Sequence, residues 1–371
     1  MRTLTKPLVG LIVVVMLSTM IISVTASTKS YAQGQVTING AGSSFAFPLI
    51  DTWRVDYQKV KPGVNINYQS IGSGGGVRQF TARTVDFGAT DAPLSPREQK
   101  AAQGAVQIPV LIGSVVPAYN IPGIPAKGLK FTGSVLADIF QGKITKWNDP
   151  QIQSLNPGKS LPSASIVVVH RSDGSGTTFV WTSFLSSVSP QWNQTVGASK
   201  SVPWPTGIGA PGNEGVANAI KGSPNTIGYV ELSYALTTGI PYGLVKNPAG
   251  NFIEPSLNST KEAVSNAVAT RSLPAGDQSW SKVSLLNAPG PNSYPVASFT
   301  YLLLYKDLST NPSIDQAKAK AMVYFISWAA TSGQTFATKL NYVPLPPGVV
   351  KSAQDTLKSM TFKGTSLYTG P

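Results

Sequence analysis

The residues with the most distinctive chemistry lie in one ten-residue stretch, 170–179, whose sequence is HRSDGSGTTF. A β-branched run at 165–169 precedes it and apolar residues at helical spacing follow it, which predicts a strand and then a helix. Gly174 and Gly176 permit a tight turn that approaches a ligand closely. The first N–H groups of a helix have no partner within it, so this helix start favours an anion. Arg171 adds a positive fork that suits a tetrahedral oxyanion, although an ordinary capped helix after a glycine turn explains the stretch equally well.

Three earlier segments repeat the order of strand, small polar turn and helix. A strand at 34–39 leads into GAGSSF at 40–45, and the helix that follows ends at KPG, 61–63. A strand at 64–68 leads into IGSGGGV at 71–77, and a strand at 84–89 leads into TDAPL at 90–94. In an open α/β sheet such turns lie at the carboxyl ends of strands, where ligands bind. Together with Asp91 and the distant Arg171, they predict one site for a small anion.

The composition limits the possible chemistry. The chain has 371 residues, of which 42% are hydrophobic and 12% charged, which is typical of a globular protein of two domains. It contains no Cys and one His, so thiol catalysis, disulfides and a His/Cys zinc site are excluded. The net charge is +13, but the basic residues are scattered rather than clustered, which argues against nucleic-acid binding.

The first 32 residues have the pattern of a targeting segment. Arg2 and Lys6 precede an almost unbroken apolar run at 8–24, and two small-residue cleavage candidates follow. The run is long for a signal peptide, so an uncleaved N-terminal membrane anchor is an alternative. We therefore expect an exported protein in the periplasm or at the cell surface, either free or held by residues 1–32.

The rest of the chain carries further α/β signals. Residues 286–295 are rich in Pro and Gly and are typical of a hinge. An apolar strand is expected at 298–305, and then a helix capped by Ser313 and closed by Gly333. Its expected apolar face consists of Ile314, Ala317, Ala321, Tyr324, Phe325 and Trp328. The letters GIGAPG at 207–212 match a dinucleotide-binding pattern, but a Pro-rich stretch stands where that motif requires a strand, so we reject nucleotide binding there.

Six motifs in order resemble the phosphate-binding protein of phosphate ABC importers, an exported solute-binding protein. They are GAGSSF at 40–45, IGSGGGV at 71–77, VDFGATDAPL at 85–94, FQGKITKW at 140–147, RSDGSGT at 171–177 and IGYVE at 227–231. The resemblance extends from about Gln35 to the C-terminal region. It implies that inorganic phosphate is the ligand, that the permease subunits of an ABC importer are the partners, and that the protein is a monomer without catalytic activity, cofactor or metal.

The resemblance also implies an α/β, two-lobed periplasmic-binding-protein fold of type II, with a hinge and a ligand cleft between the lobes. Lobe I would be discontinuous, with residues 34–113 and 290–371, and lobe II would comprise 114–289. The family's phosphate-binding residues fall on Ser44, Phe45, Ser73, Asp91, Arg171, Ser175, Gly176 and Thr177. Phe45 and Gly176 would contribute backbone N–H groups, and Asp173 would hold the Arg171 guanidinium. Ser44 stands where the family often has Thr, and both donate through a hydroxyl.

Two other functions remain open at this point. An exported phosphoester hydrolase would need metal ligands, or a nucleophile with a base. The sequence has no G-x-S-x-G elbow, no H-E-x-x-H motif and no second His. A surface protein that retains the binding-protein fold without transport is the other alternative, because a fold does not fix a function.

Overall fold

The structure is a computed structural model, and it describes residues 35–124, 127–269 and 272–368. The expected signal peptide or anchor at 1–32 lies outside these residues. Within the described ranges, none of the helices combines the length and apolar character that a membrane span requires. The described residues form one compact unit.

Eleven strands of the described chain form one sheet with the main order β2-β1-β3-β11-β4-β8-β6-β7. Their bounds are β1 (Val36–Gly42), β2 (Val64–Ser70), β3 (Phe87–Thr90), β4 (Ala105–Asn120), β6 (Val167–Arg171), β7 (Ile208–Ala210), β8 (Thr226–Glu231) and β11 (Ala297–Tyr305). Off this path lie β5 (Lys127–Phe131), β9 (Tyr242–Lys246) and β10 (Phe252–Ile253). We call the part built on β1, β2, β3 and β11 lobe I, and the part built on β6, β7 and β8 lobe II.

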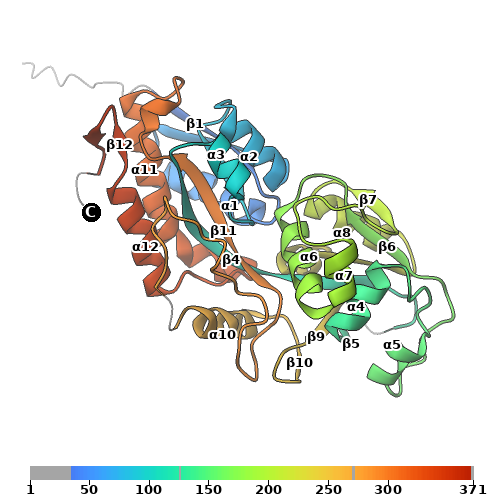
Figure 1. Ribbon diagram of the computed structural model, residues 1–371. Helices are drawn as coiled ribbons and strands as arrows, with labels where there is room; N and C mark the ends of the chain where they lie inside the picture. The colour runs from blue at the N-terminus through green and yellow to red at the C-terminus, as the bar shows by residue number, and fades with distance from the viewer. Residues whose placement is uncertain (1–34, 125–126, 270–271, 369–371) are drawn as a thin grey trace, which may run out of the picture. The chain divides into compact units, whose positions relative to one another are not determined.

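Strand β4 belongs to both lobes, as Figure 1 shows. Residues 105–114 pair with β11 in lobe I, and residues 115–120 pair with β8 in lobe II. Every residue of β4 is buried except Asn120, which is half-buried. The strand is a near-continuous apolar run because it is buried on both faces over almost its whole length.

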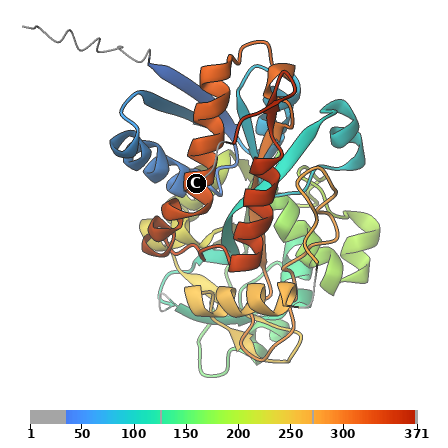
Figure 2. The ribbon, with the colours of Figure 1, turned by 90° about the vertical axis from the view of Figure 1, so that its left-hand side faces the viewer.

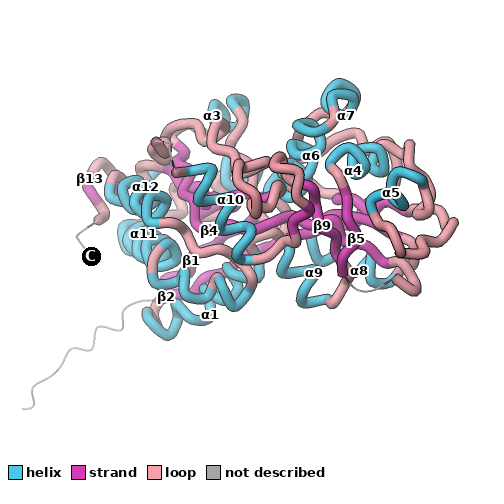
Figure 3. Tube along the Cα trace, turned by 90° about the horizontal axis from the view of Figure 1, so that it is seen from below, coloured by secondary structure: helices cyan, strands magenta, loops and turns pink. Residues whose placement is uncertain are grey.

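Helices cover the strands of each lobe. In lobe I they are α1 (Phe47–Val60), α2 (Ser73–Thr81), α3 (Pro96–Ala101), α11 (Gln316–Ala330) and α12 (Pro347–Lys358); Figure 2 shows α11 and α12 in orange and red. In lobe II they are α4 (Gly133–Phe140), α5 (Pro150–Leu155), α6 (Gly176–Val188), α7 (Pro190–Thr195), α8 (Gly212–Gly222) and α9 (Leu232–Thr238). Figure 3 shows α4 and α6 on one side of the lobe II strands and α8 and α9 on the other.

The remaining elements are short or peripheral. They are α10 (Leu257–Val268), η1 (Leu308–Thr310), η2 (Ser332–Phe336), η3 (Thr338–Leu340), and the hairpin of β12 (Thr361–Phe362) and β13 (Thr365–Ser366). Helix α1 illustrates how the core forms, because its buried residues Leu49, Ile50, Trp53 and Tyr57 share one helical face. The Trp53 indole N–H donates to the carbonyl of Gly333 at 2.8 Å, so this large side chain is buried without an unpaired donor.

Most expected elements occur, with shifted ends. The first strand continues to Gly42, beyond the expected 34–39, because β2 and β3 both pair with its last residues. The third strand starts at Phe87 rather than at Thr84, since the residues before it form a turn after α2. The expected strand at 165–169 is found at Val167–Arg171, so Arg171 itself ends the strand.

The expected cap of the C-terminal helix is wrong. Asp315, not Ser313, precedes α11, and its carboxylate accepts from the backbone N–H of Lys318 at 2.7 Å. Ser313 instead donates to the Asn311 side chain. The expected apolar face is also partly wrong, because α11 buries Ala319, Met322, Val323, Phe325, Ile326, Ala329 and Ala330. The helix is apolar around much of its circumference, so periodicity alone placed the buried face poorly.

Among the described residues, no strand immediately precedes the glycine pattern at 207–212, as expected from its Pro-rich sequence. A short strand, β7, lies within the pattern, and α8 begins at its last glycine. The Pro-rich stretch before it does not prevent a strand-to-helix junction from forming. This junction contributes to the site described next.

Candidate functional site

The carboxyl ends of three neighbouring strands form the lobe I edge of the site. Gly42 at the end of β1 pairs with Ser70 of β2 and Ala89 of β3, and all three strands are parallel. Parallel strands deliver the residues that follow them to one edge of a sheet. The residues delivered here are Ser43, Ser44, Ser73 and Asp91, and all four are buried.

Asp91 is the only carboxylate among these lobe I residues, and neutral hydroxyls hold it. Its Oδ1 accepts from Ser43 at 2.5 Å and from Thr300 of β11 at 2.7 Å. Its Oδ2 accepts from Ser73 at 3.2 Å. Burial raises the pKa of Asp91, while these hydroxyl donors and the charge of Arg171 oppose the rise. The less occupied Oδ2 keeps capacity to accept one more proton donor.

The lobe II edge carries the guanidinium of Arg171 at the end of β6. The side chain is 1% exposed and pairs with Asp173 through two bonds, Nε to Oδ1 at 2.7 Å and Nη2 to Oδ2 at 2.5 Å. Its Nη1 lies 3.4 Å from the Thr177 hydroxyl. A guanidinium has five N–H donors in a planar fork, so this arrangement fixes its orientation and leaves donors for an anion.

Asp173 is the expected partner of Arg171, and its environment keeps it ionised. Burial would raise its pKa, but the hydrogen bonds and charge of Arg171 hold the pKa below the usual value. The backbone N–H of Gly212, at the start of α8, also donates to Asp173 at 3.1 Å. Gly72 in lobe I faces the same carboxylate with a φ of 76°, and a Cβ there would collide with Oδ2. Only glycine fits this approach between the lobes.

Backbone N–H groups at helix starts complete the edges. Ser175 caps α6 by accepting from the N–H of Thr178 at 3.0 Å, so its own hydrogen remains to be donated. Among the described residues, the hydrogen-bond network includes no acceptor for the N–H of Phe45, Gly176 or Thr177. These three residues are buried, and a buried unpaired N–H is costly unless a ligand accepts from it.

The two edges are in direct contact. The N–H of Gly74 donates to the carbonyl of Gly174 at 2.7 Å, and Tyr234 of α9 donates to the carbonyl of Ser44 at 2.7 Å. A Cβ at Gly176 would collide with the Asp91 carboxylate and the Ser73 hydroxyl. Residues from both lobes therefore form one buried polar cluster.

The structure brings every expected site residue into this cluster: Ser44, Phe45, Ser73, Asp91, Arg171, Ser175, Gly176, Thr177 and Asp173. Three of their partners, Ser43, Thr300 and Asn213, were not predicted from the sequence. Ser43 lies inside a quoted motif, and Thr300 is polar within an apolar strand, so both gave a signal. Asn213 follows the glycine pattern that was set aside, and it contacts Ser44 and Thr177 at 3.0 Å each.

A second buried carboxyl, Glu231, lies where the lobes meet. Burial raises its pKa to about 8, although bonds from Ser233 and Tyr342 oppose the rise. Its Oε1 has no hydrogen-bond partner among the described residues. The hydroxyl of Tyr342 in lobe I lies 3.1 Å from Glu231 Oε2 and 2.7 Å from the carbonyl oxygen of Phe45, so its one hydrogen can be donated to either. The carboxyl thus adjoins the site without belonging to it.

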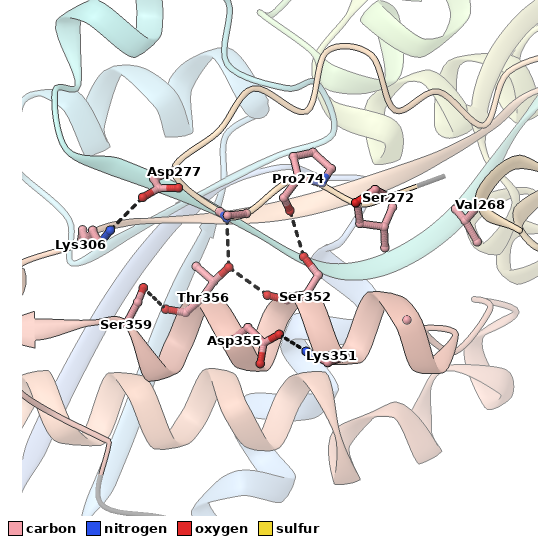
Figure 4. A pocket seen from close by; sticks show the side chains of 14 residues that line it. Val268, Ser272, Pro274, Asp277, Lys306, Lys351, Ser352, Asp355, Thr356 and Ser359 are labelled. Atoms are coloured by element: carbon pink, nitrogen blue, oxygen red, sulfur yellow. Dashed lines mark hydrogen bonds and ion pairs between the residues drawn. The ribbon is translucent and has the colours of Figure 1, made fainter. Parts of the chain in front are cut away.

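A separate pocket of about 550 Å³ lies between α12 and the segment at 272–277 (Figure 4). Two lysines line it, and each is paired: Lys306 with Asp277 at 2.8 Å, and Lys351 with Asp355. Since the charges of this described lining already neutralise one another, the pocket is a poorer anion site than the buried cluster.

The fold and the cluster define a receptor class in which two α/β lobes direct helix starts at one small ligand. Residues 24–332 match the PBP superfamily domain. The chain is 45% identical over 340 residues to "Phosphate-binding protein PstS" of Pasteurella multocida, covering 92% of this chain and 95% of the relative. It is 39% identical over 328 residues to the protein of that name from Methanocaldococcus jannaschii, and the match covers 85% of this chain and 84% of that relative. The chain therefore belongs to the PBP superfamily and, within it, to the family of phosphate-binding proteins called PstS.

Solved structures agree on the fold. A high-affinity periplasmic phosphate-binding protein, solved with bound phosphate, has a TM-score of 0.67 at 20% identity. The match covers 86% of this chain and 93% of the solved chain. A phosphate-binding protein from Stenotrophomonas maltophilia has a TM-score of 0.65 at 19% identity with the same coverage. At these identities the likeness establishes the two-lobed fold alone.

Proposed function

We propose that this protein binds inorganic phosphate outside the cytoplasm and delivers it to the permease of an ABC importer. The observation that carries the proposal is the buried pair of unlike groups, Asp91 from lobe I and Arg171 from lobe II, in one cluster with helix-start N–H groups. The names of the curated relatives support the same ligand. In this proposal the ligand contacts Ser44, Phe45, Ser73, Asp91, Arg171, Ser175, Gly176 and Thr177.

The protonation of the ligand explains why a carboxylate belongs in an anion site. Monohydrogen and dihydrogen phosphate carry a proton that Asp91 Oδ2 can accept, because only the Ser73 hydroxyl occupies that oxygen. Sulfate has no proton at neutral pH and would place a charged oxygen against a charged acceptor. The unfavourable contact lowers sulfate affinity without affecting phosphate.

The lobe boundaries are part of the proposal: residues 34–113 and 290–371 for lobe I, and 114–289 for lobe II. The change of pairing partner along β4, between Ser114 and Val115, supports the first boundary. We expect phosphate to draw the lobes together about this crossing and the segment at 286–295. Small-angle scattering should give a smaller radius of gyration with phosphate than without it. Identical curves would contradict closure.

The protein acts as a carrier rather than as an enzyme in this proposal. Among the described residues, no group of three or more His, Asp or Glu side chains could hold a metal ion. His170, the only imidazole, stacks on Trp204 at 4.8 Å between ring centroids, and burial lowers its pKa. We place the protein in the periplasm or at the cell surface as a monomer that binds permease subunits and no nucleic acid. A phosphoester hydrolase, or a surface protein that retains the fold without transport, is the alternative.

Calorimetric titration of phosphate-free protein with phosphate, and then with sulfate, tests the proposal directly. We expect one phosphate per chain, recovered unchanged, and much weaker sulfate binding. Steady release of phosphate from phosphoesters by the pure protein, abolished by Ser175→Ala, would favour the hydrolase. Absence of phosphate binding would overturn the proposal.

A further inference from the structure

Asn213 has a side chain that touches both edges of the site. It lies in the first turn of α8 and is fully buried. Its Oδ1 accepts from the backbone N–H of Glu231 at 2.9 Å. A backbone N–H can only donate, so the amide oxygen must face Glu231, and Nδ2 must face the opposite way. The orientation of this amide is therefore fixed by lobe II itself.

The amide nitrogen of Asn213 meets two hydroxyls of the phosphate site. Nδ2 donates to Ser44 Oγ at 3.0 Å in lobe I and to Thr177 Oγ1 at 3.0 Å in lobe II. The backbone N–H of Asn213 also donates to Ser44 Oγ, at 3.1 Å. Arg171 Nη1 approaches Thr177 Oγ1 at 3.4 Å. Each hydroxyl oxygen thus has two N–H donors directed at it.

A hydroxyl has two acceptor positions and one hydrogen. When two N–H groups occupy both acceptor positions of Ser44, its hydrogen must be donated elsewhere. The same holds for Thr177, with the weaker second donor from Arg171. Two groups that could either donate or accept are thereby restricted to donating.

We propose that Asn213 is a positioning residue that makes the hydroxyls of Ser44 and Thr177 obligatory donors. The inference rests on the proposed phosphate function and deepens it. Both hydroxyls can then bind only unprotonated oxygens of the ligand, so the protonated oxygen is directed to Asp91. Ser44 belongs to lobe I and Asn213 to lobe II, so Ser44 acquires its fixed polarity only when the lobes meet. Selectivity for the oxyanion is consequently coupled to closure.

The test compares Asn213→Asp with Asn213→Ala. The Asp variant has nearly the same shape, but its outer oxygen accepts hydrogens and would turn both hydroxyls away from the ligand. We expect it to weaken phosphate binding at pH 8 on the order of 100-fold, and Asn213→Ala on the order of 10-fold, since Ala merely frees the hydroxyls to rotate. A purely structural role predicts the reverse order, because Ala leaves a cavity and Asp does not. Lowering the pH should partly restore binding by the Asp variant, because a protonated carboxyl regains one donor.

The negative charge of the Asp variant could weaken binding by repulsion alone, so a double-mutant cycle is needed. The cycle compares the loss of phosphate affinity that Asn213→Ala causes in two backgrounds, wild type and the variant carrying Ser44→Ala and Thr177→Val. We expect the loss in the second background, expressed as a change in log Kd, to be less than half of that in the first. An undiminished loss in that background would overturn the inference. This cycle also decides the matter if the Asp variant fails to fold.

Asn156 provides a matched control in lobe II. It is 2% exposed, its Oδ1 accepts from the backbone N–H of Lys130 at 2.8 Å, and its Nδ2 donates to two carbonyl oxygens. Asn156→Asp should change phosphate affinity less than about twofold, since it contacts no site hydroxyl. The inference would be overturned if Asn156→Asp and Asn213→Asp lost equal phosphate affinity. It would also be overturned if Asn213→Asp bound phosphate as well as the wild-type protein does. Failure of the wild-type protein to bind phosphate would instead overturn the proposed function, and this inference with it.

Discussion

Lobe I and lobe II handle charge in different ways. Lobe II carries both signs, because Arg171 is paired with Asp173 of the same loop. Lobe I carries the carboxylate of Asp91, which is held by neutral hydroxyls. When all three groups are ionised they leave one negative charge, which by itself would repel an anion. We infer that affinity depends on oriented N–H and O–H dipoles, with the guanidinium acting as a geometrical fork.

The hydroxyls of the site also form two sets that differ in hydrogen-bond direction. Ser43, Ser73 and Thr300 donate to Asp91 within lobe I, and so define a fixed acceptor. Ser44 and Thr177 accept from Asn213 of lobe II, and so remain donors. We infer that Asp91 of lobe I reads the proton of the ligand, whereas the hydroxyls that Asn213 fixes, including Ser44 of lobe I, bind its charged oxygens. Four predictions test this division.

The largest expected effect on binding comes from Arg171→Ala. Removal of the fork also leaves Asp173, which is only 23% exposed, without its charged partner. We therefore expect a loss of about 3 kcal/mol, more than a hundredfold in Kd. Phosphate and arsenate should weaken alike, since both present the same oxygens. The phosphate affinity of Arg171→Lys should lie between those of wild type and Arg171→Ala, because Lys keeps the charge without the planar fork. Calorimetric titration of these variants measures the loss, with Arg54→Ala as a surface control. If Arg171→Ala binds phosphate within tenfold of the wild-type affinity, the division of roles within the site is contradicted.

The second prediction separates the buried carboxyls. The pKa of Glu231 is raised from 4.5 to about 8, so the folded protein holds a proton there that the unfolded chain releases. The resulting stability is fully present below about pH 4.5 and is lost as the pH rises through about 8. We expect Glu231→Gln to remove a dependence of about 2 kcal/mol in the free energy of unfolding between pH 5 and pH 7. Asp91, whose pKa is also raised, should leave a residual slope of the same sign.

Urea unfolding of phosphate-free protein at several pH values measures this slope. Wild type and Glu231→Gln should differ in slope even if the substitution lowers stability throughout. Parallel curves for the two proteins would show that Glu231 is ionised in the folded protein at neutral pH.

The third prediction concerns Asp91→Asn. Ser43 and Thr300 both donate to Oδ1, so the amide oxygen should remain there and Nδ2 should replace Oδ2 on the side that faces Gly176. The acceptor for the ligand proton would become a donor, which suits sulfate. We expect the ratio of phosphate to sulfate affinity to fall by about tenfold or more. Both anions should be titrated at one pH and one salt concentration, and an unchanged ratio would disprove proton reading by Asp91.

The smallest effect is expected at the ion pair between the lobes, Lys200 of lobe II and Glu98 of lobe I, at 2.6 Å. Glu98→Gln keeps the helix cap of α3, because Gln also serves at that position, but removes the charge. The pair is partly exposed, so phosphate binding should weaken by about 0.5 kcal/mol, and less at high salt. Asp51→Asn, which breaks the pair with Arg54 within α1, is the control and should leave binding unchanged.

The sequence predicted the two edges well for a local reason. Each turn that carries Ser44, Ser73 or Ser175 follows a strand and precedes a helix, so the motif and its position on the sheet are encoded together. The contacts between the edges could not be predicted in this way. Asn213 meets Ser44 across 169 residues of chain, and its signal was one strand of three residues after a Pro-rich stretch. Helix ends were equally hard to predict from the sequence, because Ser313 and Asp315 are both good caps and only the fold selects Asp315.

Strand β4 has a consequence for how the protein unfolds. Its 16 residues form the inner edge of both lobes, with β11 along one part and β8 along the other. If one lobe melts, the other loses part of a buried strand and gains an exposed edge. The two lobes should therefore melt as one cooperative unit, with a single calorimetric transition whose van't Hoff and measured enthalpies agree. For the same reason neither lobe should fold when expressed as a separate fragment, however well each performs its half of the recognition.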